Sequence, residues 1–362
     1  MSMEERVTQW LLAHQRRLWL AVMWCFVICT SFYVHLTFIE GSDFLGINVR
    51  SLESMMTGKA IKPHIFRQMV PIMAHGVVAV TPLGLQDSAT QAMAEWLNTP
   101  KSMFATMVSY RHSASKPPEL RDEWLYPFTV VVILDYLFLM GYVFYVWKLA
   151  QLLFPTLFSV QVMAPVFALL AIPPFCSKFA YIYDFPVLFF SAWMTYILLR
   201  GRLWLYTLFV GVATLNKETS IYLLAVFVLY GWKMLPPKVW RYHAALQLGL
   251  ICVVKLAVSV YYADSPGEFL WTRGLYDHIM TNLDGFAVYT WLGLMAATLL
   301  IGARWHEKPY ILRCWAVLVP FAAMSWLIFG MRNEYRVMYE VFPPLVLMAC
   351  HTLARAARWH ET

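Results

Sequence analysis

The sequence has few charged residues and none of the common motifs for a metal or a nucleotide. Only 14% of its 362 residues are charged and 60% are hydrophobic, whereas a soluble domain carries about 25% charged residues. The six cysteines form neither a CxxC pair nor a cluster with histidines, which disfavours a structural zinc site. Without a Walker A or GxGxxG motif, a cytoplasmic nucleotide site is unsupported.

The hydrophobic residues form long continuous runs. Runs of this kind predict membrane-spanning helices rather than the alternating strands of a β-barrel, so we expect an all-α polytopic membrane protein with about ten transmembrane helices. The predicted spans are Leu18–Phe38, Leu125–Tyr145, Ser159–Phe175, Asp184–Leu199, Leu203–Leu215, Ser220–Leu235, His243–Tyr262, Ala287–Ala303, Ile311–Phe329 and Val337–Ala354. One further apolar segment, Ile65–Thr81, contains Arg67, Pro71 and His75, which favours a helix at the membrane interface over another span.

The basic residues of the short loops predict the orientation. With the N-terminus inside, they lie mainly on the cytoplasmic side, as the positive-inside rule requires, and the net charge of +7 is no sign of nucleic-acid binding. We expect one integral-membrane domain, 1–362, in a bacterial inner membrane with both termini cytoplasmic (1–17 and 355–362). Residues 39–124 would form an extracytoplasmic segment of interfacial helices, and residues 125–354 the helical bundle.

Two acidic residues, Glu40 and Asp43, directly follow the first span on the predicted outer side. A carboxylate held there by a rigid helix can act as a general base on a hydroxyl group or bind a divalent cation. The position of Glu40 and Asp43 in the sequence, taken alone, favours the interpretation that both are ordinary solvent-exposed acids. Asp184, at the start of the fourth predicted span, could likewise act in catalysis or cap the N-terminus of its helix.

The other polar clusters on this side suit a phosphate group. Arginine pairs bidentately with phosphate oxygens, although Arg67 could also reach lipid headgroups non-specifically. The segment Asn216–Thr219 is the most specific, because four polar residues between two apolar runs are costly unless they are paired or line a wet cavity. Lys217 and Glu218 could pair with each other or with Asp184.

The last predicted outer loop carries Arg332 and Arg336 with Glu334 between them. Two arginines four residues apart can lie on one face of a helix and contact one phosphate group. Two charged residues, Asp135 and Lys255, fall inside predicted spans, where a charge normally faces a partner or water. The sequence does not indicate which partner either residue has.

Taken together, these segments resemble the GT-C superfamily of integral-membrane glycosyltransferases, and most closely its bacterial polyprenyl-phosphate-sugar-dependent members. The residues that carry the resemblance are Asp43-Phe44, Phe66-Arg67-Gln68-Met69-Val70-Pro71, Tyr183-Asp184-Phe185-Pro186, Leu215-Asn216-Lys217-Glu218-Thr219 and Glu334-Tyr335-Arg336. The resemblance implies that the acid after the first span, Asp43 or less well Glu40, is the catalytic or metal-linked carboxylate. A divalent cation is the one cofactor that this implies.

The predicted function is transfer of a sugar from a polyprenyl-phosphate-linked donor to a glycan, lipid or protein acceptor on the extracytoplasmic face. The predicted catalytic residues are Asp43, Glu40, Asp184 and Glu218. The predicted substrate-binding residues are Arg67, Lys217, Asn216, Tyr183, Arg332, Glu334 and Arg336. Alternative functions are a polysaccharide polymerase or O-antigen-ligase-like enzyme, a lipid or solute transporter or flippase, and a non-catalytic assembly subunit.

Overall fold

The computed structural model describes residues 3–40, 52–60, 62, 64–98, 122–173, 181–266, 279–280, 288–329 and 335–357. Every regular element within these residues is a helix, which confirms the predicted all-α class. The α-helices are α1 (Met3–Glu40), α2 (Leu52–Met56), α3 (Met69–Val80), α4 (Leu83–Asn98), α6 (Asp122–Leu153), α7 (Phe158–Leu170), α9 (Asp184–Leu199), α10 (Leu203–Asn216), α11 (Ile221–Met234), α12 (Pro237–Tyr261), α14 (Val288–Gly302), α15 (Tyr310–Val317), α16 (Val319–Phe329) and α17 (Phe342–Ala356). The 3-10 helices are η2 (His64–Phe66), η3 (Glu218–Ser220), η4 (Trp305–Glu307) and η5 (Tyr335–Glu340).

Four of the described helical segments are long and apolar enough to cross a membrane. They cover His14–Leu36, Glu123–Leu153, Pro237–Tyr261 and Tyr310–Ile328, with lengths of 23, 31, 25 and 19 residues. They correspond to the first, second, seventh and ninth predicted spans. The last of them is α15 and α16 together, which are separated at Leu318.

The other predicted spans correspond to shorter helices. Helices α7, α9, α10 and α11 have 13, 16, 14 and 14 residues. At about 1.5 Å per residue they measure roughly 20–24 Å, less than the ~30 Å of the hydrocarbon core. Helix α3, with 12 residues, is shorter still. The structure therefore supports four spans among its described residues rather than the ten predicted.

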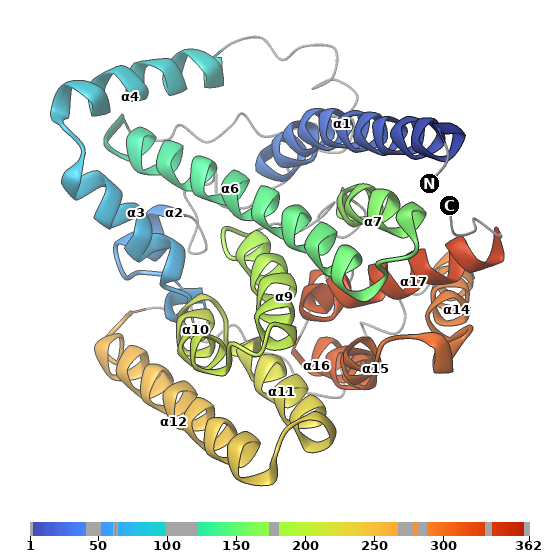
Figure 1. Ribbon diagram of the computed structural model, residues 1–362. Helices are drawn as coiled ribbons and strands as arrows, with labels where there is room; N and C mark the ends of the chain where they lie inside the picture. Colours follow the sequence, from blue (N-terminus) through green and yellow to red (C-terminus); the bar gives the residue numbers. More distant parts are fainter. Residues whose placement is uncertain are drawn as a thin grey trace.

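The helices form a bundle whose centre is the contact between α6 and α9 (Figure 1). The outer flank of α12 is apolar and bare, since Leu248, Val253, Leu256 and Val260 are all exposed. A soluble protein rarely leaves such a continuous apolar surface uncovered. A lipid environment accounts for it.

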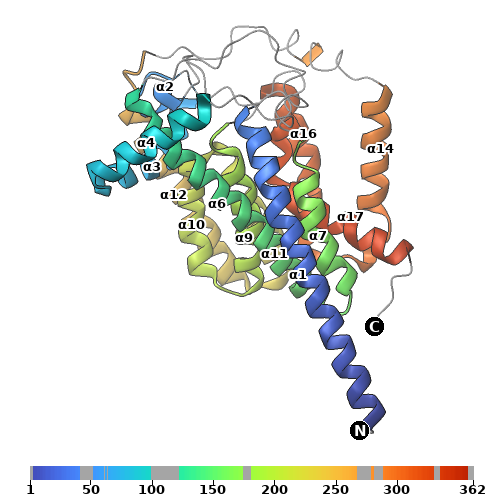
Figure 2. The same ribbon diagram turned by 90° about the horizontal axis from the view of Figure 1, so that it is seen from above.

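Several helix ends meet at one end of the bundle. In Figure 2 the first half of α1 extends past the other helices, and α2, α3 and α4 lie toward the opposite end. The Ser265 hydroxyl, just after α12, donates to the Gly58 carbonyl at 2.9 Å, and the Tyr126 hydroxyl, near the start of α6, donates to Thr81 Oγ1 at 2.9 Å. The ends of α12 and α3 and the start of α6 are thereby brought to the side where the polar clusters gather.

Candidate functional site

The turn between α10 and α11 is the centre of the candidate site. Helix α10 ends at Asn216, and Lys217 then adopts an extended backbone conformation with φ −160° and ψ 145°. The 3-10 turn η3 follows and leads directly into α11. This break in the helix gives the consecutive side chains of Lys217 and Glu218 different partners.

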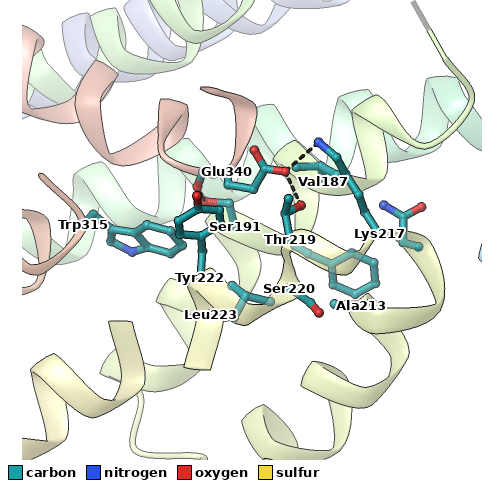
Figure 3. Close-up of a pocket in the computed structure, with 12 residues that line it drawn as sticks. Val187, Ser191, Ala213, Lys217, Thr219, Ser220, Tyr222, Leu223, Trp315 and Glu340 are labelled. Atoms are coloured by element: carbon teal, nitrogen blue, oxygen red, sulfur yellow. Dashed lines mark hydrogen bonds and ion pairs between the residues drawn. The ribbon is translucent and has the colours of Figure 1, made fainter. Parts of the chain in front are cut away.

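Lys217 pairs with Glu340, the last residue of η5. Its Nζ lies 2.7 Å from Glu340 Oε1, and each side chain is only 6% exposed. The Thr219 hydroxyl donates to the same carboxylate oxygen, and the Ser191 hydroxyl of α9 donates to the Glu340 backbone carbonyl at 2.6 Å. Figure 3 shows Lys217 and Thr219 converging on this carboxylate. The pair therefore joins the turn to η5 deep inside the protein.

Glu218 forms a second ion pair, with Arg67. Arg67 Nη2 lies 2.5 Å from Glu218 Oε1 and Arg67 Nε lies 3.3 Å from Oε2. Lys255 Nζ approaches Oε2 at 3.7 Å. Burial raises the pKa of the Glu218 carboxyl, but the two neighbouring cations outweigh that effect and hold the pKa well below its ordinary value. A carboxylate with such a low pKa is a weak general base, so this geometry favours an anchoring role for Glu218.

Aromatic side chains hold Arg67 in place. Its guanidinium carbon lies 4.3 Å from the centre of the Tyr183 ring, a cation–π contact. The Tyr183 hydroxyl is 3.1 Å from His64 Nδ1, and the Tyr181 and Tyr183 rings stack with their centres 5.4 Å apart. Asn216 Nδ2 donates to the Tyr183 carbonyl at 3.0 Å. Tyr183 thus links Arg67 to the end of α10.

Asp184 is fully buried at the first residue of α9. Its Oδ2 accepts the Tyr181 backbone N–H at 3.0 Å, which is the kind of local contact that a structural role requires. Lys217 and Glu218 pair with Glu340 and Arg67, rather than with each other or with Asp184 as the sequence suggested. A catalytic role for Asp184 stays a prediction.

The remaining predicted site residues cannot be placed in the same way. Asp43, Arg332 and Glu334 lie outside the described residues. Glu40 ends α1 and Arg336 lies within η5, but the side chains of both are outside the described part of the structure. The structure thus brings together Arg67, Tyr183, Asn216, Lys217 and Glu218, and the roles of the others stay predictions.

For two residues of this cluster, the sequence did not predict the partner. Lys255 was recognised as a costly intramembrane charge, and its partner is Glu218. Glu340 falls within the last predicted span, Val337–Ala354. An acid inside an apolar run is itself a signal, because a buried charge requires a partner, but the run does not reveal that the partner is Lys217.

One cavity is lined by members of the charged cluster, and a second is lined by residues close to them in the sequence. A small one of about 20 Å³ is lined by Asn216, Lys217 and Glu340, among others. A larger one of about 400 Å³ lies between α3, α6, α9 and α10, and all of its lining residues are apolar or aromatic. Met69 and Leu215 line the larger cavity, and they lie within two residues of Arg67 and Asn216 in the sequence. An apolar cavity thus begins beside the cations.

No group of three or more His, Cys, Asp or Glu side chains that could hold a metal ion occurs among the described residues. Asp43, the predicted metal ligand, is not one of them, so a divalent cation stays a prediction. Comparisons of the chain with protein-family models, with curated proteins and with solved structures gave no match.

Proposed function

We propose that the chain is a membrane glycosyltransferase that moves a sugar from a polyprenyl-phosphate-linked donor to a glycan, lipid or protein acceptor. The reaction would occur on the extracytoplasmic face of a bacterial inner membrane, with both termini in the cytoplasm. The observation that carries this proposal is the position of the Arg67, Lys217 and Lys255 cluster beside a 400 Å³ apolar cavity. A ligand that fits both features has an anionic headgroup and a long apolar chain.

The charge of the cluster favours an anion. Among the residues that the structure describes, three cations, Arg67, Lys217 and Lys255, meet two carboxylates, Glu218 and Glu340. Lys255 has the longest pairing distance, 3.7 Å, and its side chain is 27% exposed. It is therefore the cation best able to turn toward a phosphate. Positive charge fixed beside the phosphate would stabilise the negative charge that grows there as the bond to the sugar breaks.

The apolar cavity supports a lipid-linked rather than a soluble donor. Its lining includes Phe138, Phe189, Trp193 and Phe209, which would bind an isoprenoid chain by excluding it from polar surroundings. Nucleotide sugars are not available outside the cytoplasm, so a donor on that face must arrive attached to a lipid. We therefore expect the lipid chain of the donor to contribute to its binding affinity.

A binding experiment tests the donor assignment. Protein in nanodiscs should bind undecaprenyl phosphate at least tenfold more tightly than the uncharged alcohol undecaprenol. Lys255→Met should reduce this preference about tenfold, which corresponds to about 1.4 kcal/mol, and Lys255→Arg should preserve most of it. Lys238→Met is the matched control, since Lys238 is an exposed lysine near the start of the same helix. Equal binding of phosphate and alcohol would contradict the proposal.

A transfer assay tests the reaction itself. With a purified pool of undecaprenyl-phosphate-linked sugars, Asp43→Asn should abolish transfer without impairing membrane insertion, as the resemblance predicts for a base or metal ligand. Arg332→Ala and Arg336→Ala should weaken donor use, and Lys at either position should restore it only in part. Movement of the lipid across the membrane without any sugar transfer would instead identify a transporter.

A further inference from the structure

The hydroxyl and indole groups that line the small cavity beside Glu340 already form hydrogen bonds within the protein. The Ser191 and Thr219 hydroxyls donate to Glu340, and the Trp315 indole N–H donates to Thr195 Oγ1 at 2.9 Å. Two other lining hydroxyls, those of Ser220 and Tyr222, form hydrogen bonds to Thr214 and Ser325. These groups are turned toward the protein rather than toward a guest.

Two acceptor atoms of the same lining are in the opposite situation. Asn216 Oδ1 and Glu340 Oε2 are buried, and within the described part of the chain neither has a hydrogen-bond partner. Asn216 uses its Nδ2 on the Tyr183 carbonyl, and Glu340 uses Oε1 on Lys217 and Thr219. A buried acceptor without a partner is costly, so the pair calls for a guest that donates hydrogen bonds.

The size of the cavity limits that guest to one small group. A volume of about 20 Å³ exceeds the roughly 10–15 Å³ that a single water requires. A phosphate group or a sugar ring is much larger. The phosphate of a lipid-linked sugar donor is also excluded by chemistry, because a phosphodiester has no O–H to donate and its oxygens would face two further acceptors.

We propose that this cavity binds one hydroxyl group, which donates hydrogen bonds to Asn216 Oδ1 or Glu340 Oε2. In the setting of the proposed function, on which this reading rests, the hydroxyl belongs to the acceptor, and a water takes its place when no acceptor is bound. The donor phosphate lies on the other side of the turn, near Arg67 and Lys255. Lys217 and Glu218 therefore separate a hydroxyl site from a phosphate site.

A high-resolution structure of the unmodified protein in phosphate buffer tests the site without reference to activity. We expect an ordered water within hydrogen-bond distance of Asn216 Oδ1 or Glu340 Oε2. A dry cavity, or a phosphate ion in this position, would overturn the assignment. This measurement decides the question even if the variants described next do not fold.

Two variants separate the hydroxyl site from the donor site. Asn216→Leu and Glu340→Gln should bind undecaprenyl phosphate as the parent does but transfer sugar at least tenfold more slowly, while Glu307→Gln, an exposed acid on another segment, should change neither. Loss of undecaprenyl phosphate binding in both variants would place the phosphate in this cavity and refute the inference. Unchanged transfer would show that the site holds only water. Failure of the parent itself to bind undecaprenyl phosphate would instead refute the proposed function.

Discussion

The pair formed by Lys217 and Glu340 places two charges where almost no water reaches them. Each side chain is 6% exposed, so each charge depends on the other for its stability. Removing one member of a buried pair leaves an uncompensated charge, whereas replacing both with apolar residues of similar size is often neutral. The two single changes and the double change therefore give different results if the pair is a closed unit.

Lys217→Met should lower the free energy of unfolding by about 3–5 kcal/mol, the usual cost of leaving a buried charge without its partner. The double variant Lys217→Met/Glu340→Met should recover most of this loss. Unfolding in mixed micelles with increasing denaturing detergent measures all three proteins. If the effects of the two single changes simply add in the double variant, the residues do not act as a pair.

Lys308 should make stability depend on pH in the alkaline range. Its side chain is 2% exposed, and its Nζ donates to Thr352 Oγ1 at 2.6 Å and to the Met348 carbonyl at 3.2 Å. Burial lowers the pKa of Lys308 from 10.5 to about 8. Between these two values the unfolded chain binds more protons than the folded one, so this residue makes stability rise with pH.

The comparison with Lys308→Met isolates this contribution. The melting temperature of the parent, relative to that of the variant, should increase from pH 8 to pH 10.5 and stay constant below pH 8. Other lysines and tyrosines titrate in both proteins and cancel in the difference. A difference that is flat across the whole range would show that Lys308 keeps its ordinary pKa in the folded protein.

At the scale of helices, α6 and α9 are packed most tightly around Gly141. A Cβ atom added there would lie 2.8 Å from Phe189 Cδ2, too close for any real contact. Gly141→Ala should therefore destabilise the protein by about 1–3 kcal/mol, the typical cost of overpacking a core. Gly249→Ala in α12 is the control, because no atom lies within 4 Å of its added Cβ.

Thermal unfolding of both variants measures this contrast. The alanine at position 249 should be neutral or slightly stabilising, since alanine favours a helix over glycine by about 1 kcal/mol. Equal melting temperatures for the two variants would mean that the ring of Phe189 moves aside freely, and that the α6–α9 contact is looser than described.

The sequence predicts where helices lie better than where they begin. The run Leu203–Leu215 matches α10 to within one residue, because polar residues flank it closely. The predicted span Val337–Ala354 instead divides into η5 and α17. Two prolines, Pro343 and Pro344, stand at the start of α17, where proline is tolerated, but they disfavour a helix through the preceding residues. The hydrophobicity of the segment alone does not predict this interruption between η5 and α17.

For the site as well, the sequence reveals features that depend on neighbouring residues but not contacts between residues far apart in the chain. Arg67, Asn216, Lys217 and Glu218 were predicted because polar residues at the edge of apolar runs are conspicuous. Glu340 was not, because its importance comes from Lys217, which is 123 residues away. Spacing along the chain carries no information on such a contact. The packing of η5 against α9 provides it.

At the scale of the whole molecule, the orientation in the membrane can be tested with single cysteines at exposed positions. Lys59→Cys and Asp264→Cys lie at the end of the bundle that carries the site. Arg200→Cys lies in the turn between α9 and α10, and Lys238→Cys lies at the start of α12. In a background without native cysteines, a membrane-impermeant reagent added outside intact cells should label only the first two. The positive-inside rule requires this result.

The opposite labelling pattern would place the charged cluster at the cytoplasmic face. That outcome would remove the reason for a lipid-linked donor, because nucleotide sugars are available there. Labelling of all four positions from outside would show that the helices between them do not cross the membrane. Labelling after permeabilisation is the control for accessibility of each cysteine.

The distance along the chain between Lys217 and Glu340 also sets an order of events during synthesis. Lys217 is synthesised with α10 and α11, but its counter-ion Glu340 is translated 123 residues later. Until then the lysine must stay hydrated or be held by another factor of the insertion machinery. A chain that stops before position 340 would therefore retain an unneutralised charge inside its bundle. Such a product should be recognised and degraded by membrane quality control.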